Sequence, residues 1–274
     1  MTINPSDDCS LSVEPDDCWR QTDLGTRIDR NGKTTYHVLT SDRRAGVFFE
    51  KVFDQDHNLL RIQKRSRSST SESHFDTASG ALKRIFESST LPDGNSMTKE
   101  LVYREPYSSN ASDESVIVIS PNGELVRRVE REHVGSRTVF QGQTEYNLDG
   151  TPATTVNHHM DQASGRLLRR EQIQWHSEGH RSLAETFHFN MAGALVKYSK
   201  VLYHSGAGPF LEEIVVYDSQ GQTIAKREIV SYSFEGQRTS RDILTYSYVG
   251  EILERKTIFF DGTGKAVATR QSNP

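Results

Sequence analysis

Arginines recur at a nearly fixed offset behind a turn motif, and the planar guanidinium group of arginine is well suited to binding carboxylates. If successive hairpins keep register, these side chains form a ladder along one sheet, and the ladder would dock an acidic partner surface. Glutamates sit just C-terminal to several of them, so the alternative is a polar face of alternating sign that keeps the sheet in solution. The candidate binding arginines are Arg127, Arg169, Arg170 and Arg227.

Aromatic residues near the C-terminus form a second candidate surface. Tyr232, Tyr246 and Tyr248 alternate with serine and threonine, so the rings of each segment share one strand face. If residues 231–234 and 245–248 form one hairpin, four rings pack there as cross-strand neighbours. Two interpretations stay open: a half-buried sheet face, or a tyrosine-lined groove that binds a ligand or a peptide.

Histidines are potential metal ligands, and several cluster in one stretch of the sequence: His158, His159, His176, His180 and His188. On strands, ligands on one face need even separations, and all of these except His159 satisfy that condition. A zinc site also needs three or four ligands that converge at about 2.1 Å, and His176 and His180 straddle a turn. We therefore expect no metal site and no cofactor.

The two cysteines, Cys9 and Cys18, lie among aspartates near the N-terminus. Their spacing does not match C-x₂-C and no second ligand pair follows, so neither a zinc site nor a redox pair is predicted. We expect residues 1–27 to form an acidic, poorly ordered tail.

Composition argues against several classes of function. The chain has 274 residues, 33 of them basic and 37 acidic, and its net charge of −4 is unlike that of a nucleic-acid binder. No run approaches the ~18 apolar residues of a membrane span. The N-terminus lacks a secretory pattern, so we expect a cytoplasmic protein. Motifs of serine hydrolases, phosphate-binding loops and zinc proteases are absent, which favours a non-catalytic role and leaves catalytic residues unknown.

One recurring pattern supplies the elements that must position these residues. A bulky apolar residue is followed by Asp, Asn or Ser, two or three residues, Gly, and then an apolar–basic stretch. Asp or Asn bonds the backbone two residues on and Gly adopts positive φ, so each copy predicts a hairpin turn. Most copies begin 22 to 29 residues apart; gaps of 44 and 43 indicate a decayed copy, and one gap of 14 is short. The copies begin at Ile28, Phe53 (with Asn58 in place of Gly), Phe75, Ile119, Tyr146, Met160, Phe189, Tyr217 and Phe260.

These turns predict an all-β fold: an antiparallel meander of repeated β-hairpins that forms an extended curved sheet, as one domain over residues 28–274. The polar stretches 66–73, 87–98 and 106–115 are predicted to be surface loops. The alternative is a closed β-barrel that holds a small apolar ligand or acts on it. Its cavity would be lined by Tyr198, Tyr203, Tyr232, Tyr246 and Tyr248.

The copies at residues 75–84, 160–169 and 217–221 resemble the YD repeats of Rhs-type proteins and are similar to the MORN-variant repeats of YwqK-type antitoxin proteins. The resemblance follows the rhythm of residues 28–271. It implies a sheet used as an interaction surface, in an antitoxin-, immunity- or scaffold-like protein whose partner is a toxin or another part of a bacterial complex. The end strands offer a second route, by pairing with a partner or with another copy of the chain.

Overall fold

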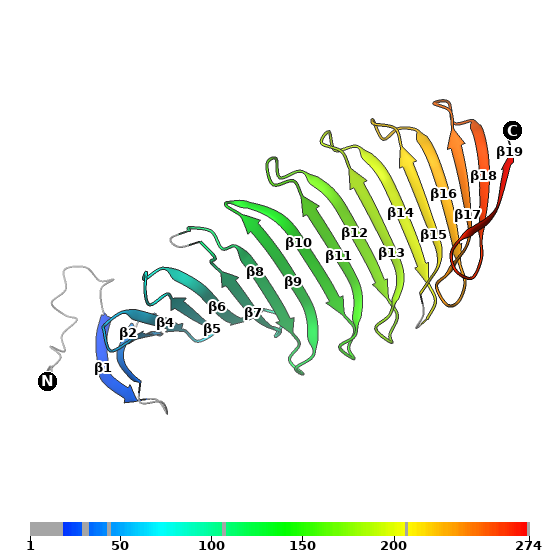
Figure 1. The fold of residues 1–274 in the computed structure, drawn as a ribbon. Helices are drawn as coiled ribbons and strands as arrows, with labels where there is room; N and C mark the ends of the chain where they lie inside the picture. Colours follow the sequence, from blue (N-terminus) through cyan, green and yellow to red (C-terminus); the bar gives the residue numbers. More distant parts are fainter. Residues whose placement is uncertain (1–18, 29–32, 43–44, 106–107, 206–207, 273–274) are drawn as a thin grey trace. The chain divides into compact units, whose positions relative to one another are not determined.

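The computed structural model describes residues 19–28, 33–42, 45–105, 108–205 and 208–272. Cys9, Cys18 and the predicted tail up to residue 18 lie outside the described residues. Every regular element in the described ranges is a β-strand, as Figure 1 shows, and these ranges hold no helix that could cross a membrane. The all-β prediction is confirmed.

The chain divides into two compact units, Met1–Gly123 and Glu124–Pro274. The strands of the first unit are β1 (Trp19–Ile28), β2 (Thr34–Asp42), β3 (Val47–Phe53), β4 (Leu59–Arg65), β5 (Ser69–Phe75), β6 (Leu82–Thr90), β7 (Ser96–Val102) and β8 (Asp113–Ile119). Those of the second unit are β9 (Leu125–Val134), β10 (Arg137–Tyr146), β11 (Pro152–Met160), β12 (Leu167–Trp175), β13 (Arg181–Phe189), β14 (Leu195–Tyr203), β15 (Pro209–Tyr217), β16 (Ile224–Tyr232), β17 (Arg238–Tyr246), β18 (Ile252–Phe260) and β19 (Ala266–Ser272).

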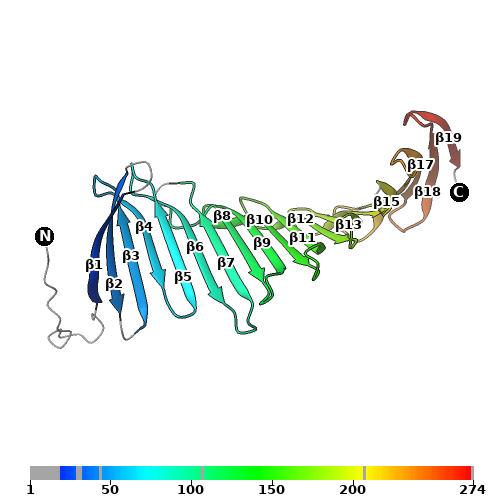
Figure 2. The ribbon, with the colours of Figure 1, turned by 90° about the horizontal axis from the view of Figure 1, so that it is seen from below.

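Within each unit, the described strands contact only their neighbours in the chain, and every such pair is antiparallel. Figures 1 and 2 show the strands of each unit side by side in chain order. The predicted meander of hairpins is therefore confirmed. Because the first and last strands of each unit do not pair in the described residues, the closed-barrel alternative is wrong for both units. A barrel of this size needs one nearly continuous apolar face, and both faces here carry charged residues.

The first strand begins inside the segment predicted to be a tail. Strand β1 covers Trp19–Ile28 and pairs with β2 in the register Ile28↔Thr34. The sequence pattern marks only the turn that follows Ile28, and a hairpin turn needs a strand on its N-terminal side as well. The single domain over residues 28–274 stays a prediction.

Glycine and aspartate build the turns as the repeat pattern predicts. All seven of the motif glycines that the structure describes have positive φ, from +71° at Gly80 to +88° at Gly123. In the turn after β15, the backbone N–H groups of Gln220 and Gln222 donate to the Asp218 carboxylate at 3.0 and 2.9 Å. In the copy without Gly, His57 rather than Asn58 takes the left-handed conformation, with φ of 65°.

The repeat unit is one strand and its turn, and not the predicted pair of strands. From β10 to β18 the strands end 14 or 15 residues apart, so the gap of 14 is the true period. The gap of 43 between Tyr217 and Phe260 holds two turns, led by Ser233 and Ser247, and the gap of 29 after Met160 holds one more, led by His176. Ser233, Ser247 and His176 each accept the bond from a positive-φ glycine three residues later.

About half of the residues in the polar stretches of the first unit are strand, which corrects their prediction as inserted loops in part; the described residues from 108 to 112 are not strand. Residues 69–75 form β5, residues 87–98 include parts of β6 and β7, and Asp113 begins β8. Both faces of these strands meet solvent, so serine, threonine and glutamate fill strand positions without any need for an apolar alternation.

The hydrophobic core is thin and is formed by side chains on the faces of a single sheet. Val129, Ile173, Val215 and Val230 are buried, but no large side chain is fully buried in the described residues. Because the described strands contact only their neighbours in the chain, cross-strand contacts supply most of the packing.

The two faces of the second unit are distinguished by their side chains. Rows of cross-strand partners place Arg170, Phe187, Tyr198, Val215 and Arg227 on one face, here called the tyrosine face. The next row, with Glu171, Thr186, Ser199, Ile214 and Glu228, lies on the opposite face, here called the glutamate face.

Each of these strands ends with a bulky residue, here called its closing residue, and the closing residues occupy both faces of the sheet. At each turn a bulge shifts the register by one residue, as between Val216 and Tyr217. The two edges are an odd number of rows apart, so alternation turns their closing residues to opposite faces. Phe189, Tyr217 and Tyr246 lie at one edge on the tyrosine face, whereas Trp175, Tyr203 and Tyr232 lie at the other edge on the glutamate face.

Candidate functional site

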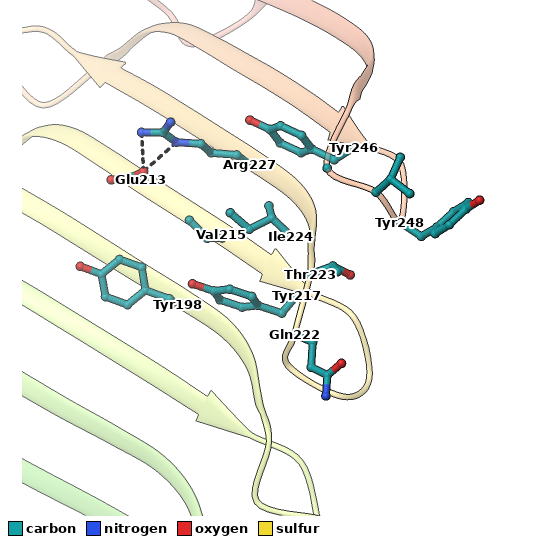
Figure 3. A pocket seen from close by; sticks show the side chains of 12 residues that line it. Tyr198, Glu213, Val215, Tyr217, Gln222, Thr223, Ile224, Arg227, Tyr246 and Tyr248 are labelled. Carbon is teal, nitrogen blue, oxygen red and sulfur yellow. Dashed lines mark hydrogen bonds and ion pairs between the residues drawn. The ribbon is translucent and has the colours of Figure 1, made fainter.

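A groove of about 510 Å³ runs over β14–β17 on the tyrosine face, beside the turns that follow β15 and β17. Its lining residues are Tyr198, Glu213, Val215, Tyr217, Gln222, Thr223, Ile224, Arg227, Tyr246, Tyr248, Val249 and Gly250. Figure 3 shows the rings of Tyr198, Tyr217 and Tyr246 lying along the sheet with their hydroxyl groups directed the same way, and Tyr248 pointing away from them.

The repeat places the tyrosines at this edge. Tyr217 closes β15 and Tyr246 closes β17, and both strands run antiparallel to β16, so their last residues lie at the same edge of the sheet. Val215 and Ile224 provide apolar surface between them. Tyr248 lies in the turn after β17 and is 86% exposed, so its ring is available to a partner.

One ion pair lies in the groove. The Nε atom of Arg227 donates to Glu213 Oε1 at 2.7 Å, and a second nitrogen of the same guanidinium lies 2.7 Å from that oxygen. The side chains remain 41% and 25% exposed. These are the only charged residues that line the groove in the described part of the chain, so the groove has no net charge.

Tyr198 is held in place by its neighbours. Its hydroxyl donates to Glu185 at 2.6 Å, and its ring centroid lies 5.1 Å from that of Phe187. Burial and the adjacent Glu185 carboxylate raise the pKa of Tyr198 above its ordinary value, so the phenol keeps its proton at neutral pH. In the part of the chain that the structure describes, the groove lining includes neither histidine nor cysteine, and its one carboxylate, that of Glu213, is bonded to Arg227. This set of groups is suited to binding through ring faces and hydrogen bonds.

Three of the seven residues predicted to bind a partner line the groove: Arg227, Tyr246 and Tyr248. Tyr232 lies elsewhere, because it closes β16 at the other edge and on the glutamate face, where its hydroxyl donates to Glu212 at 2.8 Å. Burial and the Glu212 carboxylate raise the pKa of Tyr232. The four rings of residues 231–234 and 245–248 are therefore not cross-strand neighbours.

The predicted arginine ladder does not form as one row. Arg169 and Arg170 are consecutive in β12 and point to opposite faces. Arg127 lies near the start of β9, which runs antiparallel to β12, and it pairs with Glu145 in a row towards the opposite edge from Arg170. Arg169 bonds to Glu171 on the glutamate face, whereas the guanidinium of Arg170 lies 5.9 Å from the Phe187 ring on the tyrosine face. The binding roles of Arg127, Arg169 and Arg170 stay predictions.

The clustered histidines do not share one face. His158 and Arg170 are partners on the tyrosine face, whereas His159 and His188 flank Arg169 on the glutamate face. Even sequence separation fails as a guide because a bulge at each turn shifts the alternation. Among the described residues, no group of three or more His, Cys, Asp or Glu side chains is placed to hold a metal ion.

Sequence reasoning did not assign Tyr217 or Glu213 to a site, and it named Tyr198 only for a barrel cavity. A signal for Tyr217 was present, since it occupies the closing position of a repeat copy, as Tyr246 does two repeats later. Tyr198 and Glu213 lie in mid-strand, and only the pairing of β14 with β15 and β16 brings them to the groove.

Comparison with known proteins identifies no family for this chain. No protein-family model matches the sequence, and no curated protein matches it. Among solved structures, a porin-like protein from Bacteroides uniformis is 11% identical, with 91% of this chain and 94% of that chain covered. The TM-score of that match is 0.20, too low to support any statement about this chain.

Proposed function

We propose that this chain is a non-catalytic protein-binding module that holds a partner on the tyrosine groove of its second unit. One observation carries the proposal: an open groove on a single-layer sheet collects four tyrosines, among them the 86% exposed Tyr248. Tyrosine is enriched at the centres of protein interfaces, because its ring buries a large area and its hydroxyl still finds a hydrogen-bond partner.

The shape and chemistry of the groove favour a macromolecular segment over an enclosed small ligand. The groove lies on the surface of one sheet layer, because in the described residues each of β14–β17 contacts only its neighbouring strands in the chain. A ligand there keeps one side in solvent, which suits a segment of a larger partner. The resemblance to antitoxin and Rhs repeats is consistent with a toxin or a scaffold component as that partner.

The test compares capture by variants altered on opposite faces of the same unit. A Tyr246→Ala/Tyr248→Ala double variant is expected to lose the partner that the wild-type chain retains from a host lysate. The matched control is Tyr232→Ala, on the glutamate face, which is expected to retain it. Thermal unfolding of all three proteins checks that each is folded. Equal capture by the double variant and the wild type would overturn the proposal.

Strand β19 favours a second candidate function, self-association. All seven of its residues are exposed, and in the described residues it pairs only with β18. An open strand edge presents unpaired N–H and C=O groups that a second copy can pair with. Sedimentation should then show a mass that rises with concentration, and Val267→Lys on this strand should suppress the rise. A wild-type chain that stays monomeric at high micromolar concentration would rule this candidate out.

A further inference from the structure

We propose that the segment held in the tyrosine groove is a proline-rich, uncharged peptide in the polyproline II conformation, lying across the strands with a proline at every third residue. This inference rests on the function proposed above and goes beyond it, because it specifies the conformation and the sequence period of the ligand.

The first support is a match of two lengths. Tyr217 and Tyr246 close β15 and β17, which are separated by one strand, β16. Neighbouring strands lie about 4.7–4.9 Å apart, so residues two strands apart are about 9.4–9.8 Å apart. A polyproline II helix has three residues per turn at about 3.1 Å each, so its repeat is about 9.3 Å. Consecutive turns of such a helix therefore meet consecutive tyrosines.

The same spacing holds for β13, the preceding strand that runs in the same direction as β15. Phe189 closes β13 on the tyrosine face, two strands before Tyr217. A row of aromatic residues thus recurs at every second strand, at Phe189, Tyr217 and Tyr246. Aromatic-lined grooves are the usual docking surface for proline-rich segments, because proline rings pack against ring faces at little cost in conformational entropy.

The second support is hydrogen-bond complementarity. Strands β15 and β16 are paired on both sides, so their backbone groups are used in the sheet and cannot bind an added strand. Within the described residues, the hydroxyl groups of Tyr217 and Tyr246 have no hydrogen-bond partner. They can donate to ligand carbonyls. Proline has no N–H, so a proline-rich segment brings acceptors and few donors, which is what these groups require.

The third support is charge. Among the described residues, the only charged ones that line the groove, Arg227 and Glu213, are bonded to each other. A strongly acidic or strongly basic ligand would have to break or compete with this pair. An uncharged segment leaves it intact.

The test uses the full chain and synthetic peptides of about twelve residues, long enough for four polyproline II turns. One peptide carries proline at every third position among neutral residues, and two isomers of the same composition carry it at every second position or in one block. Fluorescence anisotropy of labelled peptides is expected to show at least about tenfold tighter binding of the three-residue spacing. Tyr217→Ala and Tyr246→Ala should each weaken that binding about tenfold, whereas Tyr232→Ala on the other face should not.

The outcomes separate this inference from the function on which it rests. Equal affinity for the three isomers, or tighter binding of a helical or non-proline peptide, would overturn the polyproline II ligand. If natural-partner capture still depended on Tyr246 and Tyr248, the protein-binding function would stand without it. If capture were also unchanged in the double variant, both would fail.

Discussion

Arg227 on β16 donates from Nε to Glu213 on β15 at 2.7 Å, and this pair contributes the only charges that line the tyrosine groove in the described residues. It joins neighbouring strands and leaves both side chains in contact with solvent. The pair therefore affects the ligand preference of the groove more than the stability of the sheet, because exposed ion pairs stabilise a fold by about 0–1 kcal/mol.

Removing either charge should change ligand preference with little effect on stability. Glu213→Gln leaves the guanidinium unpaired, so the groove should bind acidic peptides more tightly and its affinity should become dependent on salt. Arg227→Gln should produce the reverse preference, for basic peptides. Binding titrations at low and high salt test this, and urea unfolding should show losses below about 1 kcal/mol. Identical charge preference in the two variants would contradict the role of the pair.

The turn after β15 should be less tolerant of a side chain than the turn after β13. Gly221 has φ of +73°, and an added Cβ would lie 2.9 Å from the backbone oxygen of Leu195, the first residue of β14. Gly193 has φ of +84°, but an added Cβ there meets nothing within 4 Å. Gly193→Ala should therefore cost about 1–2 kcal/mol for the left-handed conformation alone, and Gly221→Ala distinctly more. Urea unfolding of the two variants measures the difference, and equal losses would show that the turn can move away.

Glu228 should make the stability of the fold depend on pH in the acidic range. Its side chain is 7% exposed and bonds to Arg241 at 2.6 Å and to Lys226 at 2.5 Å. Burial opposes ionisation, but these bonds outweigh it and hold the pKa of Glu228 below its ordinary value of 4.5. A carboxylate with a lowered pKa stabilises the fold fully above 4.5, and the stabilisation is lost as the pH falls through the folded-state pKa.

Glu228→Gln should therefore cost about 1–3 kcal/mol at neutral pH, with the difference from wild type shrinking below pH 4.5. Denaturant unfolding across this pH range measures it. Glu130→Gln is the matched control, since Glu130 lies in the same row on β9 and its pair with Arg128 is about half exposed. A similar loss in the control would show that burial is not the cause.

Charge reversal on β12 should report which face meets the partner. Arg170→Glu alters the tyrosine face beside Phe187, whereas Arg169→Glu alters the glutamate face beside Glu171. If the partner binds the tyrosine face, Arg170→Glu should reduce capture and Arg169→Glu should leave it unchanged. Measurement of captured partner per folded chain decides between them, and the opposite pattern would move the binding surface to the glutamate face.

The turns were predictable because their causes are local. Asp218 bonds to the backbone a few residues ahead, and Gly221 adopts a conformation that other residues avoid. The copies led by Ser233 and Ser247 fit the same pattern but were not counted, and their omission lengthened the apparent period.

The candidate site was only partly predictable. Tyr246 and Arg227 stand out by type and spacing, but their neighbours Tyr198 and Glu213 come from other strands and have no local signature. The same limit explains Tyr232, which resembles Tyr246 in sequence context and lies on the opposite face.

The sequence by itself determined the class of fold and the places where the chain reverses, because a turn depends on the conformational freedom of glycine and on bonds between near neighbours. Only the tertiary structure decided which side chains share a face and an edge. That choice depends on strand direction and on the one-residue register shift at each bulge, whose effects add along the sheet, so Tyr217 and Tyr246 meet in one groove while Tyr232 lies on the opposite face.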